Sequence, residues 1–327
     1  MKRILTAFAA LVLAACGAGK RYVISDGAAI GTTFHICAEL GGGASAADIY
    51  SAMKEVEREA RASMSIFDEG SLLNRINRGE TDSIDEHIAR NFAIARTVGE
   101  LSGGRYDITV KPLTEAWGFA AREGDERPNL DSLLRLVGAD KWHVEGGRVV
   151  KADPRVQFDL NSVAKGYTVD MAAQRLEAMG AENYIVEIGG EVRCRGVNPS
   201  GELWRIGIDT PFEGNMSPGA SMSGAVVLND RALATSGNYR RFHTTADGRK
   251  IVHTIDPRTG EGAVSRLLSA TVTAATCAEA DALATMFLVL GDGEACRMAS
   301  EMRDTVGVFF ILAGEGDEYE FFNTLDK

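Results

Sequence analysis

Hydrophobic and polar positions along the chain repeat with two different periods. Apolar residues at helical spacing, with charge on the opposite face, predict amphipathic helices over 48–64 and 85–101. A third, almost entirely apolar run over 280–290 predicts a buried helix. A short helix is expected within 64–77 and another after the loop at 103–110.

Alternating segments between these helices predict strands, several of them joined by Gly-rich turns. Strand pairs are expected over 22–40, over 141–153 as a hairpin, and over 184–196, where Gly189-Gly190 breaks the pair. A strand over 157–160 is expected to run straight into a helix near Ser162. Single strands are expected over 203–209, 224–229, 250–255, 268–275, 306–312 and 318–322. Interleaved helices and strand hairpins favour an α+β fold with mixed, largely antiparallel sheets and flanking helices. Residues 22–327 are expected to form one domain or two close-packed lobes.

The first residues have the pattern of a secretory signal. A basic pair, a short apolar stretch and Leu13-Ala14-Ala15-Cys16 occur in that order. The pattern resembles a bacterial lipoprotein leader over 1–15, with Cys16 lipidated and a tether over 16–21; an ordinary signal peptide with a chance cysteine is the alternative. We therefore expect an extracytoplasmic protein held to the membrane by a lipid anchor, on the periplasmic side if the source has two membranes.

Net charge and cysteine spacing exclude some classes of binding partner and site. The net charge is -11, and it becomes about -13 once the leader's two basic groups are removed. An acidic protein is not built to bind nucleic acid. The four other cysteines have neither zinc-site nor CxxC spacing, and any pairing among them stays open.

The segment FDLNSVAKGY at 158–167 carries candidate chemistry. Asp159, Ser162 and Lys165 fall at steps of three, and Gly166 leaves the backbone open to close approach. A helix start with free N–H groups and a lysine suits a phosphate. The plainer interpretation is that Ser162 caps a helix and the two charged groups are solvated.

The segment EADALAT at 279–285 sets Asp281 and Thr285 four apart in an apolar helix, on one stripe. A carboxylate buried there needs a partner, and a cation is one such partner. Alternatively, Asp281 caps the helix start and Thr285 bonds back to a carbonyl. Together with Ser162, these hard oxygen ligands suit a magnesium ion bound to a phosphate-bearing ligand.

Two further segments are candidates. HTIDPRTG at 253–260 supplies His253 as a general base or phosphate donor, with Asp256 in a turn beside it. ATSGNYRRF at 234–242 reads as a small-residue turn before Arg240 and Arg241, which either line an anionic ligand or form a basic loop.

Taken in order, these segments resemble the ApbE family of flavin transferases. The resemblance rests on FDLNSVAKGYTVD, VEIGGEVRCRG, ATSGNYRRF, HTIDPRTG and EADALATMFLVLG, with RYDITVKPLTEAWGF and SMSIF also fitting, and it runs from about Ile30 to Gly291. It implies magnesium-dependent transfer of FMN from FAD to a threonine hydroxyl of a target protein, with release of AMP. Usual acceptors are membrane redox-pump subunits exposed outside the cytoplasm.

The resemblance also implies roles for individual residues. Metal contacts are expected at Ser162, Asp281 and Thr285. Residues expected along or near FAD are Asp159, Lys165, Tyr106, Asp107, Arg105 and Ile255. His253 is the candidate for deprotonating the threonine, with Asp256 orienting it, or the two roles are exchanged.

Two positions depart from the family pattern. Ile30 stands where the family often has Met, and Phe67 where it often has Tyr; both keep an apolar surface for flavin or adenine, but Phe67 loses a hydroxyl. Lys165 lies where some members carry Glu. Two other functions fit the same residues: an FAD pyrophosphatase that uses water as acceptor, and a lipoprotein that binds FAD without chemistry.

Overall fold

The computed structural model describes residues 19–119, 128–212, 221–238, 242–244, 250–316 and 318–325. The predicted leader, Cys16 and the start of the tether lie outside the described residues, as do Arg240 and Arg241. Among the residues that are described, no helix combines the length and hydrophobicity that a membrane span requires.

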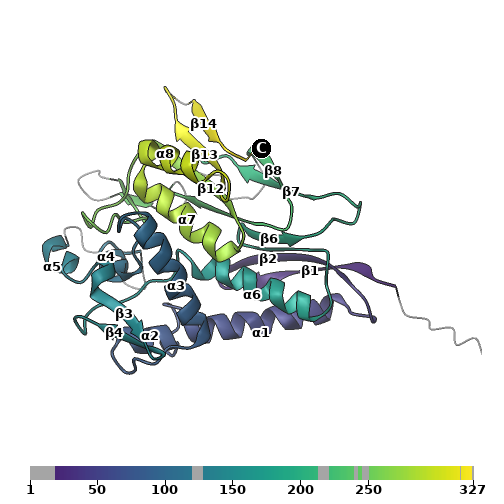
Figure 1. Cartoon of the computed structure of the whole chain (residues 1–327), viewed down its shortest axis with the longest axis horizontal. Coiled ribbons are helices and arrows are strands. Elements are labelled where there is room, and N and C mark those ends of the chain that lie inside the picture. Colours follow the sequence, from purple (N-terminus) through teal and green to yellow (C-terminus); the bar gives the residue numbers. More distant parts are fainter. Residues whose placement is uncertain are drawn as a thin grey trace, which may run out of the picture.

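One eight-stranded sheet organises the molecule (Figure 1). Every neighbouring pair in it is antiparallel. In spatial order its strands are β1 (Arg21–Ala29), β2 (Thr32–Leu40), β5 (Tyr184–Ile188), β6 (Glu191–Arg195), β9 (Ala232–Gly237), β12 (Leu267–Ala274), β13 (Gly307–Ala313) and β14 (Tyr319–Asn323). Three small antiparallel pairs add β3 (Trp142–Glu145) with β4 (Arg148–Lys151), β7 (Trp204–Asp209) with β8 (Met222–Leu228), and β10 (Phe242–Thr244) with β11 (Lys250–Val252).

Helices interleave with these strands, which confirms the predicted α+β class. They are α1 (Ala46–Met64), α2 (Leu72–Asn77), α3 (Glu86–Leu101), α4 (Lys111–Ala116), α5 (Leu130–Leu134), α6 (Ala164–Ala178), α7 (Cys277–Leu290) and α8 (Asp292–Met302), with short 3-10 turns at Ile108–Val110 and Ala139–Lys141. The predicted helices over 48–64 and 85–101 and the strand pairs over 22–40 and 184–196 are thereby confirmed, with small shifts at their ends.

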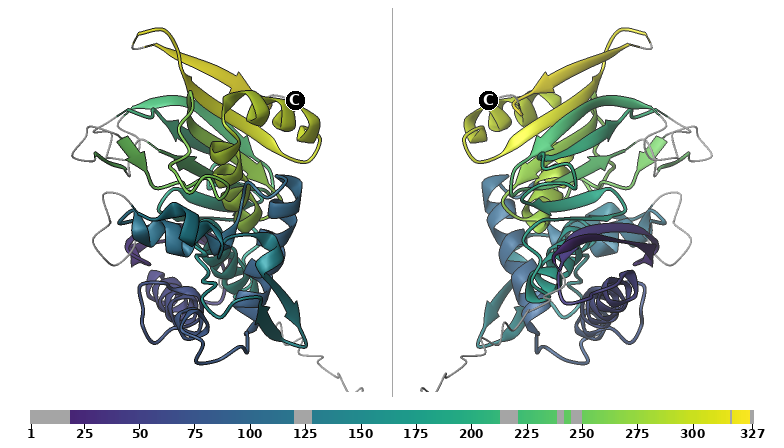
Figure 2. Two further views of the ribbon diagram at one scale, coloured as in Figure 1. Left: turned by 90° about the vertical axis from the view of Figure 1, so that its left-hand side faces the viewer. Right: turned by 90° about the vertical axis from the view of Figure 1, so that its right-hand side faces the viewer.

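Side-chain alternation gives the large sheet two different faces. On β2 and β5 the alternate residues Phe34, Ile36, Tyr184 and Val186 pack beneath the helices in the main core. On the opposite face, Cys37 and Ile185 belong to a second, smaller core closed by β7 and β8, where Trp204 is buried. Figures 1 and 2 show α6 and α7 on the helical side of this sheet.

Helix α7 is buried along most of its length, as its apolar sequence predicts. Its first turn carries a capping box, in which the Thr276 hydroxyl accepts from the Glu279 N–H and the Glu279 carboxylate accepts from the Thr276 N–H. Asp281 therefore does not cap the helix start, and its side chain is available for another purpose.

Two local predictions were wrong. Residues 157–160 are not a strand, because Phe158 exchanges both backbone bonds with the Asn77 side chain. The helix predicted to follow them begins at Ala164, close to the expected start near Ser162, although Ser162 does not cap it. Residues 234–237, read as a turn, belong to the central strand β9; their small side chains permit close packing under α7, and Ala234 is fully buried.

Candidate active site

A single large cavity gathers nearly all of the predicted site residues. Its volume is about 1220 Å³, which exceeds that of a typical small-molecule site and suits a dinucleotide. It is lined by the turns after β1 and β5, the end of α1, the start of α6, the middle of α7 and the segment after β11. The predicted residues in its lining are Ile30, Phe67, Arg105, Tyr106, Asp107, Asp159, Ser162, Lys165, His253, Ile255, Asp281 and Thr285.

The three predicted metal ligands come from two helical segments that meet in this cavity. Asp281, 4% exposed, accepts a hydrogen bond from the Gly166 N–H at 2.9 Å. Ser162 lies just before α6 and its Oγ is 2.8 Å from the Tyr106 hydroxyl. Thr285 lies one turn after Asp281, and its Oγ1 is 3.2 Å from Ser236 Oγ on β9. One carboxylate and two hydroxyls thus line the same space.

The charge balance around Asp281 favours a cation. Burial raises the pKa of Asp281, although Lys165 and the Gly166 N–H pull it down. The Lys165 ammonium lies 2.6 Å from Glu191 Oε2. Burial lowers the pKa of Lys165, but Glu191 and Asp281 outweigh burial and hold it above its ordinary value. Two buried carboxylates thus share one lysine, and the pair carries excess negative charge whenever both are ionised.

Two further acids lie in the cavity wall with their oxygens already engaged. Asp159 accepts from the Asn161 N–H at 2.8 Å, and Asp107 accepts from the Thr109 N–H and hydroxyl at 2.7 and 2.6 Å. Burial raises the pKa of both carboxyls. These bonds fix the backbone just after Tyr106 and just before Ser162, so both acids shape the wall whether or not they touch a ligand.

His253 comes directly after β11 and lines the cavity. Its ring packs edge-on against Phe119, with 6.3 Å between ring centroids. A hydrogen bond anchors the turn at Gly260 that follows in the chain, because the Trp117 indole N–H donates to the Gly260 carbonyl at 2.7 Å. A small apolar cluster that includes Leu113, Trp117 and Ile255 supports this segment.

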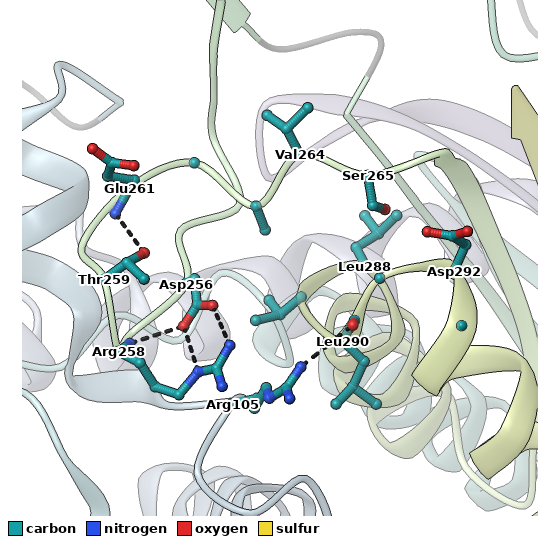
Figure 3. Close-up of a pocket in the computed structure, with 15 residues that line it drawn as sticks. Arg105, Asp256, Arg258, Thr259, Glu261, Val264, Ser265, Leu288, Leu290 and Asp292 are labelled. Atoms are coloured by element: carbon teal, nitrogen blue, oxygen red, sulfur yellow. Dashed lines mark hydrogen bonds and ion pairs between the residues drawn. The ribbon is translucent and has the colours of Figure 1, made fainter.

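Asp256 lies elsewhere. It lines a separate smaller cavity of about 340 Å³, and its two oxygens bind the Arg258 guanidinium at 3.1 and 2.7 Å (Figure 3). Burial raises the pKa of Asp256, but the bonds from Arg258 outweigh burial and hold the pKa below its ordinary value. Its predicted role in orienting His253 gains no support from this placement. Arg105 lines both cavities and pairs with Glu294 at 2.7 Å.

The two departures from the expected pattern, Ile30 and Phe67, both line the large cavity. Ile30 has a φ of 44°, a strained conformation for a β-branched residue, and its N–H donates to Glu57 Oε1 at 2.8 Å. Phe67 is 61% exposed although it lines the cavity. An aromatic ring left open to solvent in a cavity wall is well placed to stack on a planar ligand.

A family model for the ApbE family matches residues 30–310. The chain belongs to the ApbE family. This confirms the resemblance carried by the sequence motifs, and the geometry above brings those ApbE motifs together around one cavity.

Curated ApbE relatives and solved ApbE structures are similar over most of their length. The FAD:protein FMN transferase of Haemophilus influenzae is 33% identical, over 93% of this chain and 90% of the relative. The FAD:protein FMN transferase of Vibrio cholerae is also 33% identical, over 89% of each chain. The solved flavin transferase ApbE from Vibrio cholerae superposes with a TM-score of 0.81 at 31% identity, covering 93% of this chain and 97% of that one. The apo flavinyl transferase ApbE of Pseudomonas stutzeri gives 0.80 at 27% identity, covering 93% and 94%.

The donor set in the ApbE cavity fits magnesium better than a transition metal. Among the residues described, no group of three or more His, Cys, Asp or Glu could hold an ion. Magnesium does not need such a group, since it binds through one or two carboxylates, waters and substrate phosphates. Asp281 with the Ser162 and Thr285 hydroxyls meets that requirement.

Sequence reasoning missed two site residues. Glu191 is almost fully buried and pairs with Lys165, although its segment IGGE gave only a weak glycine signal. A carboxylate directly after Gly-Gly at the start of an apolar strand was the available clue. Ser236, which contacts Thr285, was hidden in the segment interpreted as a turn.

Proposed function

We propose that this chain transfers FMN from FAD to a threonine hydroxyl of a target protein. The observation that supports it best is the placement of Asp281, Ser162 and Thr285 in one dinucleotide-sized cavity of a chain that belongs to the ApbE family. The threonine oxygen forms a bond to the phosphorus on the FMN side. The bond from that phosphorus to the bridging oxygen breaks, AMP leaves with the electron pair, and the hydroxyl proton passes to a base.

Asp281, Ser162 and Thr285 are the residues that would hold a magnesium ion. When bound, the ion neutralises charge on the diphosphate as the leaving phosphate departs. The chain itself contributes position: Gly166 fixes one oxygen of Asp281, and the Tyr106 hydroxyl and Ser236 fix the two hydroxyls. Positioning and electrostatics carry most of the acceleration in phosphoryl transfer.

His253 is our candidate base for the threonine proton. It lines the cavity just after a short strand, and its ring packs against Phe119, which lines the same cavity. A base in that place needs only hydrogen-bond reach to the incoming hydroxyl.

The test combines FAD, magnesium and a candidate acceptor protein with the purified chain, and intact-mass spectrometry then looks for an FMN-sized adduct on threonine. We expect adduct with the wild-type chain, almost none with EDTA and almost none with Asp281→Ala. Asp292→Ala, which removes an acid from the smaller cavity, is the matched control and should retain transfer. Full flavinylation by Asp281→Ala would contradict the metal assignment. AMP release that does not depend on the acceptor would instead show an FAD pyrophosphatase.

We also propose that Cys16 anchors the protein to a membrane on its extracytoplasmic side, near membrane-protein acceptors. Support comes from the order of basic, apolar and small residues before this cysteine. Wild-type chain should fractionate with membranes, and Cys16→Ser should release it while leaving transfer by the purified chain intact. The lipid anchor would be contradicted if the Cys16→Ser chain stayed with the membranes, or if the wild-type chain did not fractionate with them.

A further inference from the structure

Two carboxylates, one from each helix, connect α6 and α7 by accepting hydrogen bonds from the first turn of the other helix. Asp281, in the second turn of α7, accepts from the Gly166 N–H in the first turn of α6. Asp170, in the second turn of α6, accepts from the N–H groups of Cys277 and Ala278, the first two residues of α7, at 3.0 and 2.9 Å. Each helix thus satisfies first-turn donors of the other, groups that have no partner within their own helix.

The two helices approach closely enough for this because Gly166 has no side chain. A Cβ at Gly166 would lie 2.3 Å from the Cys277 carbonyl oxygen, which real structures do not allow. The join is also charge-balanced. Arg193 on β6 donates to Asp170 at 3.2 Å and to the Ala275 carbonyl at 2.8 Å, so one guanidinium binds both the carboxylate and the chain entering α7.

Asp170 lies outside the lining of the ligand-binding space. It is 6% exposed. Its partners on α7 lie three and four residues before Asp281, which places them one helical turn from that carboxylate. Asp170 therefore ties the first turn of α7 to α6, and this tie fixes where Asp281 points relative to Ser162 and the start of α6.

We infer that Asp170 is a positioning residue for the Asp281 metal ligand, a role that rests on the magnesium site of the proposed function. Asp170→Asn keeps the size of the side chain but has one acceptor oxygen where two N–H donors converge. Its amide group would face a donor, so the first turn of α7 must shift or leave an N–H unpaired. Asp281 would then no longer hold the geometry that a divalent ion requires.

The experiment measures Mn²⁺ binding to the purified full chain by the loss of the free-ion EPR signal, with no FAD present. Residues that orient a metal ligand typically contribute about 10- to 100-fold in metal affinity, and we expect a weakening of that size for Asp170→Asn. FAD binding in EDTA, followed by flavin fluorescence, should stay unchanged, because Asp170 does not line the cavity.

Thr276→Ala is the matched control. It removes the ordinary hydroxyl cap at the same end of α7 without touching α6. Mn²⁺ affinity should remain near wild type in this variant. Equal weakening in both variants would show a general effect of the helix end and would overturn the inference, as would wild-type affinity in Asp170→Asn.

The outcomes also separate this inference from the proposed function. If the wild-type chain binds no Mn²⁺, the magnesium site fails and the inference fails with it. If wild type binds and Asp170→Asn binds equally, only the inference fails. Should the Asn chain not fold, Asp170→Glu keeps the charge but displaces the carboxylate by one methylene. Weakened Mn²⁺ binding in that variant supports positioning, and wild-type affinity overturns it.

Discussion

Phe67 illustrates how much one side chain contributes when it does not belong to the core. At 61% exposed it adds little to folding, yet it lines the large cavity. Phe67→Ala should change unfolding free energy by no more than about 0.5 kcal/mol, as for other exposed positions. It should raise the KM for FAD about two- to tenfold, because an aromatic pair contributes about 0.5–1.5 kcal/mol beyond its buried area.

Steady-state kinetics and urea unfolding of the same preparations would check this prediction. Phe67→Tyr restores the hydroxyl common in the ApbE family and should keep the wild-type KM or improve it. An unchanged KM in Phe67→Ala would show that the ring does not stack on the ligand. A large loss of stability would show that it packs against the protein instead.

At the scale of elements, the contact between α6 and α7 depends on one glycine. The atoms nearest a Cβ at Gly166 are backbone atoms of Cys277 and Ala278, which cannot rotate away. Gly166→Ala should therefore destabilise the fold by about 1–3 kcal/mol, the usual range for overpacking. It should also weaken divalent-ion binding, since the N–H of this residue holds Asp281.

Gly293→Ala supplies the comparison. Gly293 lies in α8, and no atom comes within 4 Å of a Cβ built there. This variant should be neutral or more stable by up to about 1 kcal/mol, because alanine is the better helix former. Urea unfolding of both chains decides the matter, and equal stability of Gly166→Ala and wild type would mean that the helices separate at no cost.

Elements with a strong period were the ones that sequence predicted well. The helices over 48–64 and 85–101 have clear apolar stripes, and the hairpins over 141–153 and 184–196 have Gly-Gly turns. Strand β9 was missed because its Ala, Thr, Ser and Gly residues resemble a turn, while in the fold they are small because α7 packs against them. Residues 157–160 have the sequence of a strand, but the Asn77 side chain binds their backbone at Phe158. The pattern of apolar and polar residues does not reveal such a bond.

The same reasoning applies to the candidate site. Asp281 was predicted because a carboxylate buried in an apolar helix needs a partner, and Ser162 because it falls in a motif that resembles the ApbE family. Glu191 and Asp170 were not assigned, because each becomes informative only through a partner distant in the chain, Lys165 and the first turn of α7. Asp256 shows the reverse case, since it stands close to His253 in sequence but lines a different cavity.

For the molecule as a whole, the fold places several acids in wholly or partly buried positions, some in the cavity wall and others outside it. Burial raises the pKa of each, so the folded chain holds protons that the unfolded chain releases. These acids are Asp107, Asp159, Asp170, Glu187, Glu191 and Asp281. Such groups favour the folded state at low pH and oppose it as they are forced to ionise, which is the reverse of the effect of a surface carboxylate paired with arginine.

Glu191 gives this effect a defined range. Burial raises its pKa from 4.5 to about 8, with Lys165 opposing the shift. Between these values the folded chain binds the extra proton, so this group's stabilising contribution is fully present below about 4.5 and lost as pH rises to about 8. The free energy of unfolding, measured with urea at a series of pH values without divalent ions, should therefore fall as pH rises in wild type. It should fall less steeply in Glu191→Gln. The difference is at most about 1.4 kcal/mol per pH unit. The exposed Glu202→Gln should keep the wild-type slope, and equal slopes in all three chains would mean that Glu191 stays ionised beside Lys165 throughout.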